Sequence, residues 1–239
     1  MKEHRVEIDH LFMFIEPDGP EIDALKRQGL TETYRRAHPG QGTANVCFGF
    51  DNLYLELLWL TSEAEARSPV IERTRLWERS QWRRLGTCPF GIGFRGDLAS
   101  AGVPTWDYRP PYLPSHLPPD MSIQVATDSD DPMQPMLFSF PGSTAPSEWP
   151  AERRGRLQTD GGWSQAVGLT LRLQAGMAPS AALIALAAAS GIELEQGEGP
   201  AYGMTLDLMD SDGSVTKTLA MPLGSDDGVT AGLGYRVRP

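Results

Sequence analysis

The sequence has few cysteines and no long apolar run. Its two cysteines, Cys47 and Cys88, are too few for a disulfide framework or a zinc–thiolate site. The longest apolar run, residues 181–189, is far shorter than the ~20 residues that span a bilayer. The first residues are charged, and no apolar signal core follows them. We therefore expect a cytoplasmic protein that does not act at a membrane.

Positive charge is also scarce. The 239 residues include 21 Lys and Arg against 31 Asp and Glu, which gives a formal net charge of −10. A surface that binds nucleic acid or anionic lipid needs clustered positive charge, so we expect neither as a partner of the whole surface. Hydrophobic residues make up 40% of the chain and charged residues 22%, which favours a packed core over global disorder.

The clearest pattern lies in the first 65 residues. An apolar, β-branched run at 6–15 predicts a strand. Pro20 and two acids then begin a helix, and two bases and Gly29 end it, which is the order that helix ends favour. Asp51 and Asn52 form a tight turn between two apolar runs. The unit is strand, helix and three strands, the last three at 30–36, 44–50 and 53–60.

The C-terminal segment repeats this order of elements. A strand at 166–173 precedes a helix that Pro179 begins and Gly191 ends. Three further strands are predicted at 192–196, 203–209 and 215–221. We therefore expect residues 1–65 and 165–225 to superpose as βαβββ units.

The middle of the chain is less regular. Residues 66–88 predict a connecting basic helix, either a solvated helix or an arginine surface for an anionic substrate or partner. The proline-rich segment 104–119 predicts a loop. The predicted division is a first module at 1–65, the basic helix at 66–88, a shortened or degenerate second module at 89–141, a linker at 142–164 and a C-terminal βαβββ module at 165–239.

Two polar residues interrupt apolar strands. His10 lies in the first strand and Glu56 in the fourth. A buried mid-strand carboxylate is costly unless it is paired, protonated or bound to a metal, and imidazole with carboxylate is a common ligand set for divalent ions. The alternative interpretation of His10 is a hydrogen-bonded core histidine, and that of Glu56 is an ion pair with an arginine. Together they favour one site, with both side chains on the same face of the sheet.

The segments 8–11 (IDHL) and 54–57 (YLEL) resemble the vicinal oxygen chelate superfamily. The segment 38–45 (HPGQGTAN) makes the chain similar to its glyoxalase-like domain proteins, of the glyoxalase, bleomycin resistance and dioxygenase type. The good match covers residues 6–60. The resemblance implies an α+β fold of repeated βαβββ modules whose mixed sheets curl around a central cup.

The resemblance also implies a site in that cup. His10 and Glu56 would hold a divalent metal ion (Zn, Mn, Ni or Fe(II)), with Glu56 and His38 as catalytic residues. His38, Asn45 and Tyr54 would bind the ligand, a small oxygenated metabolite. The metal would act as a Lewis acid beside developing negative charge.

The second ligand pair of the superfamily is missing from the sequence. The strands at 90–94 and 166–173 contain no histidine, and Ser139 stands where a carboxylate is expected. Asp207 lies one strand too early. The remaining candidates are His38, an exposed loop histidine or else a base or third ligand, and His116, a loop-ordering residue or a ligand.

Three functions follow as alternatives. The first is a metal-dependent lyase, isomerase or dioxygenase. The second is a non-catalytic small-molecule binding protein, as in the antibiotic-sequestering members, with a degenerate metal site. The third is a structural or interaction module, which only the basic helix supports. The sequence leaves open whether the modules pair within one chain or across a homodimer.

Overall fold

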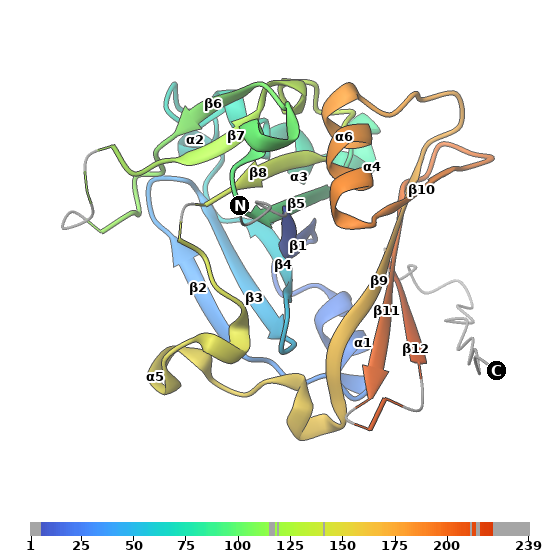
Figure 1. The fold of residues 1–239 in the computed structure, drawn as a ribbon. Helices are drawn as coiled ribbons and strands as arrows, with labels where there is room; N and C mark the ends of the chain where they lie inside the picture. The colour runs from blue at the N-terminus through green and yellow to red at the C-terminus, as the bar shows by residue number, and fades with distance from the viewer. Residues whose placement is uncertain are drawn as a thin grey trace.

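Two β-sheets organise the chain (Figure 1). The structure is a computed structural model that describes residues 6–114, 118, 120–140, 142–210, 212–213 and 216–221, so His4 and His116 lie outside the described residues. One sheet has eight strands and the other has four. This is the mixed α+β architecture that the sequence predicts. Among the described residues, no helix combines the length and the apolar character that crossing a membrane requires.

The first module has the expected element order. Its helix begins with Pro20 and carries acids in its first turn and bases in its last. The second strand starts later than predicted, because Gly29 takes a positive φ and the Leu30 amide bonds the Leu25 carbonyl at the helix end. The elements are β1 (Glu7–Phe14), α1 (Pro20–Arg27), β2 (Tyr34–His38), β3 (Thr43–Gly49) and β4 (Tyr54–Leu60).

The second module mirrors the first across the middle of the eight-stranded sheet. The strand order is β2-β3-β4-β1-β5-β8-β7-β6, so each half places its first strand beside its fourth. A short 3₁₀ turn, η2, stands where the first module has a helix. One strand, β6, lies inside the proline-rich segment that was expected to be loop. The elements are β5 (Phe90–Arg95), η2 (Leu98–Ala101), β6 (Thr105–Tyr108), β7 (Ile123–Ala126), η3 (Thr127–Asp130) and β8 (Met136–Ser139).

The two outer ends of this sheet meet. The Tyr108 hydroxyl of β6 donates a hydrogen bond of 2.7 Å to the side-chain oxygen of Gln41, which follows β2. Gly40 packs so closely on Pro111 that a Cβ there would lie 2.7 Å from the proline Cβ. The eight strands therefore curl around a central space, which we call the cup.

The C-terminal unit has the expected element order but a different strand order. In the first module β1 pairs with β4, the last strand of its unit, whereas β9 pairs with β10 in parallel and with β11 on its other side. The prediction that residues 1–65 and 165–225 superpose is therefore wrong, because the α6 crossover returns directly beside β9. The elements are β9 (Trp163–Leu173), α6 (Ala181–Ser190), β10 (Glu193–Gln196), β11 (Gly203–Asp210) and β12 (Thr216–Met221).

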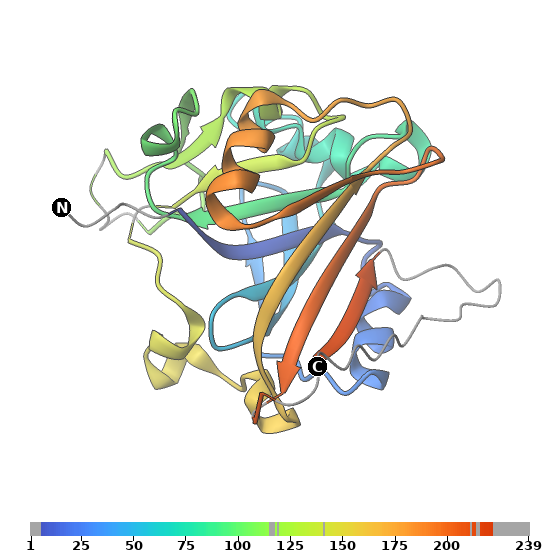
Figure 2. The same cartoon turned by 45° about the vertical axis from the view of Figure 1, so that its right-hand side comes forward.

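Helix α6 covers the second module, where the short turn η2 stands in place of a covering helix (Figure 2). The Ala182 amide at the start of α6 donates to a carboxylate oxygen of Asp128 at 2.9 Å. Leu183 and Leu186 are fully buried in the same apolar cluster as Leu98 of η2. The C-terminal unit thus supplies the helix that the second module lacks.

The predicted basic helix at 66–88 is broken into short pieces. Arg75 adopts a left-handed conformation, with φ of 57°, and separates two of them. Arg79 is fully buried rather than solvated, and its guanidinium donates to the carbonyls of residues 88, 129, 131, 132 and 134. The buried guanidinium therefore holds the loop of residues 129–134 in place by hydrogen bonds. The pieces are α2 (Glu63–Ala66), η1 (Glu72–Thr74), α3 (Leu76–Ser80) and α4 (Trp82–Leu85).

The predicted linker at 142–164 packs against the first module. The Gln158 side chain bonds both the amide and the carbonyl of Thr31, at 2.7 and 2.6 Å. The Ser147 amide bonds the Asp51 carbonyl at 3.2 Å. This segment therefore runs across one end of the cup as a strap, with the pieces η4 (Pro146–Glu148), α5 (Ala151–Arg154) and η5 (Gln158–Gly161).

Candidate functional site

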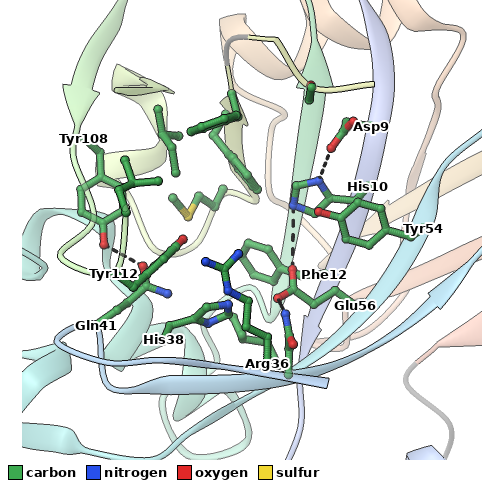
Figure 3. A pocket seen from close by; sticks show the side chains of 18 of the residues that line it. Asp9, His10, Phe12, Arg36, His38, Gln41, Tyr54, Glu56, Tyr108 and Tyr112 are labelled. Atoms are coloured by element: carbon green, nitrogen blue, oxygen red, sulfur yellow. Dashed lines mark hydrogen bonds and ion pairs between the residues drawn. The ribbon is translucent and has the colours of Figure 1, made fainter. Parts of the chain in front are cut away.

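The cup contains a cavity of about 240 Å³ (Figure 3). The two modules contribute different kinds of wall. The first module supplies most of the polar side chains, and these are Asp9, His10, Arg36, His38, Gln41, Asn45, Tyr54 and Glu56. The second module supplies mainly apolar and aromatic ones, and these are Tyr108, Tyr112, Leu113, Ile123, Met136, Phe138 and Phe140.

His10 is held in the cavity by contacts on several sides. Its Nδ1 lies 2.7 Å from a carboxylate oxygen of Asp9, and its ring stacks on Tyr54 with 4.5 Å between centroids. Phe138 meets the ring edge-on at 5.1 Å. Neighbours in a regular strand point to opposite faces, but the register of β1 against β5 shifts between Ile8 and His10. This bulge lets Asp9 and His10 both line the cavity.

Glu56 faces His10 from β4. The distance from His10 Nε2 to the nearer Glu56 oxygen is 3.8 Å, and the other Glu56 oxygen accepts a hydrogen bond from the Asn45 side-chain amide at 2.5 Å. The expected common face is therefore confirmed for this pair. Asn45 Oδ1 is buried and has no hydrogen-bond partner in the part of the chain that the structure describes.

Asp9 fixes which ring nitrogen of His10 faces the cavity. Burial by itself raises the pKa of Asp9, but the hydrogen bond and charge of His10, together with the charge of Arg95 at 3.2 Å, lower it below 3.8 overall. Asp9 is thus an acceptor, and His10 Nδ1 donates its proton to it. The other nitrogen, Nε2, is left facing Glu56, where it can exchange a proton or bind a ligand.

His38 is buried at the end of β2, so its interpretation as an exposed loop histidine is wrong. Its Nδ1 lies 3.0 Å from the Thr43 hydroxyl, and its ring packs on Tyr112 at 4.7 Å. Burial lowers its pKa below 6.5; Glu56 opposes this and Arg36 adds to it. The imidazole is therefore neutral at pH 7, and its role as a base or ligand stays a prediction.

The described residues of the second module place no donor opposite His10. Glycines occupy the facing positions of β5, and a Cβ at Gly93 would lie 2.5 Å from the His10 ring. Phe138 of β8 pairs with Gly93, while Ser139 points elsewhere and donates to the Gly96 carbonyl at 2.5 Å. Apolar side chains of this half line the cavity where the resemblance leads us to expect a second ligand pair.

The described residues do not fit a resident metal centre. His10 and Glu56 provide two donors, and no group of three or more His, Cys, Asp or Glu side chains among the described residues could hold a metal ion. Asp207 is in the other sheet, where it accepts a hydrogen bond from Thr218 at 2.6 Å. His116 lies outside the described residues. Two donors leave most coordination positions to solvent or ligand oxygens, so a bound ion would be held weakly.

Several residues of the cavity wall could not be identified from the sequence, and Asp9, Arg36 and Tyr112 show why. Asp9 was overlooked because a regular strand would turn it away from His10. Arg36 lies in an exposed edge strand, where alternation alone does not identify a cavity face. Tyr112 follows a run of prolines, and nothing in that segment predicts its contact with His38.

Comparison with known proteins agrees with the architecture. Residues 8–101 match a family described as a glyoxalase-like domain. No curated protein matches the chain. Similar solved structures include a hypothetical protein from Staphylococcus aureus, at 12% identity over 70% of each chain with a TM-score of 0.43.

Two Streptomyces coelicolor enzymes are also similar in structure. A methylmalonyl-CoA epimerase variant in complex with 2-nitronate-propionyl-CoA has 14% identity and a TM-score of 0.37, over 59% of this chain and 99% of that one. A mutant of 4-hydroxymandelate synthase has 14% identity and a TM-score of 0.43, over 90% of this chain and 62% of that one. These values are too low to say anything about activity.

The matched segment contains nearly all of β1 and the whole of β4 and β5, so it includes both His10 and Glu56. The two mirrored modules and the cup have the arrangement that the resemblance of segments 8–11 and 54–57 implies. Residues 8–101 are therefore similar to a glyoxalase-like domain, and the rest of the chain lies outside that match.

Proposed function

We propose that the protein binds one small oxygenated molecule in the cup, with the polar end of the molecule beside His10, Asn45 and Glu56. The observation that carries this proposal is the two-sided cavity, with most of its polar side chains from the first module and a mainly apolar wall opposite. Concave sites with an apolar lining and a few convergent polar groups are the usual form of a small-molecule site.

The polar wall has hydrogen-bonding capacity that the protein itself does not use. Asn45 Oδ1 is buried without a partner among the described residues, and His10 Nε2 lies too far from Glu56, at 3.8 Å, for a hydrogen bond. An unsatisfied buried polar atom costs about 1–3 kcal/mol. A ligand hydroxyl that donates a hydrogen bond to Asn45 Oδ1 would offset that cost, which supports an oxygenated ligand.

The apolar wall suits a ring or a short hydrocarbon. Phe12 and Phe138 lie 6.0 Å apart between ring centroids, and Phe138 also contacts His10. Leu58 and Met136 line the cavity and belong to the same buried apolar cluster as Phe12 and Phe138. Aromatic walls favour offset or edge-on contact with a ligand ring. The ligand would therefore be amphipathic.

A fragment screen by saturation-transfer NMR tests this proposal. The library contains small aromatic and aliphatic alcohols, hydroxyketones and acids, each beside its hydrocarbon parent. We expect oxygenated members to bind the wild type and to bind Glu56→Gln and Phe138→Ala at least tenfold more weakly. Val167→Ala, a change at an exposed position of β9, is the matched control. Binding that survives both cavity variants would reject the cup as the site.

A proton-transfer enzyme is a second candidate, and the Asp9–His10 pair favours it. Asp9 orients the ring so that His10 Nε2 faces Glu56 across 3.8 Å, and such a pair can move a proton between two positions of one bound molecule. This would be isomerase or lyase chemistry. A ligand with a carbon acid next to a carbonyl should then exchange that hydrogen in D₂O with the wild type, and not with His10→Gln.

The remaining alternatives are a metal-dependent enzyme and a purely binding protein. The described donors are too few to hold a metal ion firmly, so we assign no step to one. Retained binding without hydrogen exchange would favour the binding protein.

A further inference from the structure

Arg36 places a positive charge in the cavity. It belongs to β2 and lines the cup, and Figure 3 shows its guanidinium among the cavity side chains, above His38. The guanidinium carbon lies 5.1 Å from the centre of the Tyr112 ring, a cation–π distance. Residue 36 is exposed overall, so this charge stands at the solvent side of the cavity.

Arg35, the neighbouring residue, differs from Arg36 because it is paired with carboxylates. Arg35 belongs to the same strand, and ion pairs of 2.9 Å join it to Asp18 and to Glu32. Among the described residues, Arg36 has no carboxylate within 4.0 Å. One arginine is therefore neutralised at the surface, while the other keeps its charge available in the cavity.

The other charged groups of the cavity are already engaged. Asp9 bonds His10 and Arg95, and Glu56 accepts the hydrogen bond of Asn45. Burial keeps His38 neutral at pH 7 by lowering its pKa. An anionic ligand group would consequently find its counter-charge at Arg36.

We infer that the ligand is a small monocarboxylic acid whose carboxylate binds Arg36. A further oxygen of the ligand would lie beside His10 and Glu56, and its apolar part would reach Phe138. This inference rests on the proposed function and specifies its ligand class. The guanidinium fork matches a carboxylate in two parallel hydrogen bonds. One unpaired arginine balances one negative charge, whereas the second charge of a phosphate would enter a cavity that already holds Glu56.

Matched acid and amide probes test the inference. Phenylacetate, 3-phenylpropionate and hexanoate are each compared with the corresponding primary amide, which keeps the shape and removes the charge. Dissociation constants are measured by isothermal titration or ligand-observed NMR for the wild type, Arg36→Gln and Arg35→Gln. We expect the wild type to bind at least one acid tenfold more tightly than its amide. Arg36→Gln should lose this preference, and Arg35→Gln should keep it.

The outcomes separate this inference from the proposed function. Equal binding of acid and amide to the wild type, or equal loss of acid binding in both arginine variants, overturns the carboxylate and leaves the cup as a binding site. Displacement of the acid by inorganic phosphate at equal concentration overturns the choice of a monocarboxylate. Failure of both acids and amides to bind overturns the inference, and failure of the wider fragment screen would reject the proposed function separately.

Discussion

The two modules of the eight-stranded sheet share a strand arrangement and differ in what they place in the cup. On the first module, β1 carries His10 and β4 carries Glu56, whereas the facing residues of β5 and β8 are Gly93 and Phe138. Backbone pairing sets the position of each strand but leaves the inward side chains free to vary. The glycines are part of the site, because they leave room for first-module side chains to lie across β5.

The modules also differ in their outer cover. The first has its own helix α1, with Ile22 and Leu25 buried, whereas the second has the short turn η2 in the equivalent place and is covered by α6 from the C-terminal unit. The second module therefore depends on residues far away in the sequence, while the first contains most of what it needs. The module that carries the polar residues of the site is thus also the module with its own covering helix.

The largest expected effect comes from filling the space at a second-module glycine. In Gly91→Ala the new Cβ would lie 2.1 Å from the Phe12 ring, which also packs on Phe14 and Phe138 and cannot move freely. Overpacking of this kind costs about 2 kcal/mol. Urea unfolding should show that loss in the free energy of unfolding.

Gly199→Ala is the control for this change, because no atom lies within 4 Å of a Cβ at that position. We expect its free energy of unfolding to stay close to that of the wild type. A similar loss in both variants would show that glycine flexibility, rather than the space taken by Phe12, determines the effect.

The next effect comes from giving the second module a donor. Phe138→His places an imidazole at the ring position that contacts His10 at 5.1 Å, so His10, Glu56 and the new residue form a three-donor set. We expect Zn²⁺ or Ni²⁺ affinity to rise at least tenfold over the wild type, which corresponds to about 1.4 kcal/mol. Thermal stability measured against ion concentration reports the binding.

Two further variants delimit this gain. Glu56→Gln added to Phe138→His should remove it, and Phe140→His, two residues along in the cavity lining, should not produce it. Tight ion binding by the wild type that Glu56→Gln abolishes would instead restore the metal-dependent enzyme as the leading function.

Local patterns allowed much of the first module to be predicted. Apolar runs, the Pro20 start of α1 and the turn at Asp51 and Asn52 gave its elements, with an error of four residues only at the start of β2. His10 and Glu56 were identified because each is a polar residue in an apolar strand. These signals depend on neighbours in the sequence, so the sequence alone carries them.

The wrong predictions concern how segments far apart in the sequence are arranged in the fold. The residues that begin and end helices and turns predicted the element order of the C-terminal unit. Strand order, however, depends on which strands pair, and β10 pairs directly with β9. The prediction of a basic helix at 66–88 was wrong because Arg75 takes a left-handed conformation and Arg79 is buried among loop carbonyls. Arg36 lies against Tyr112, 76 positions further along (112 − 36), and neighbours in the sequence do not reveal this contact.

A smaller effect tests the dependence of the second module on α6. Asp128→Ala removes the carboxylate that accepts from the Ala182 amide at the start of α6. Loss of such a cap costs about 1 kcal/mol, and urea unfolding measures it. Glu195→Ala on the exposed side of β10 is the control, with little expected change. Equal stability of the two variants would mean that the bond from Ala182 to Asp128 contributes nothing measurable to the docking of α6.

The smallest effect is a pH dependence that belongs to the first module. Burial keeps the pKa of His38 in the folded protein below 6.5, so the unfolded chain takes up a proton at that side chain first as pH falls. The stability linked to His38 is therefore fully present above about pH 6.5. It declines below that pH and is lost as pH falls through the lower pKa of the folded state.

Between pH 7.5 and 6.0 this loss is at most about 0.8 kcal/mol, the limit for a folded-state imidazole that stays neutral. His38→Gln keeps a polar side chain at the end of β2 and removes the titrating group. We therefore expect the free energy of unfolding, measured in urea at the two pH values, to fall less for this variant than for the wild type. Equal slopes would show that His38 titrates alike in the folded and unfolded chains. Its burial against Thr43 and Tyr112 would then not exclude the protonated form.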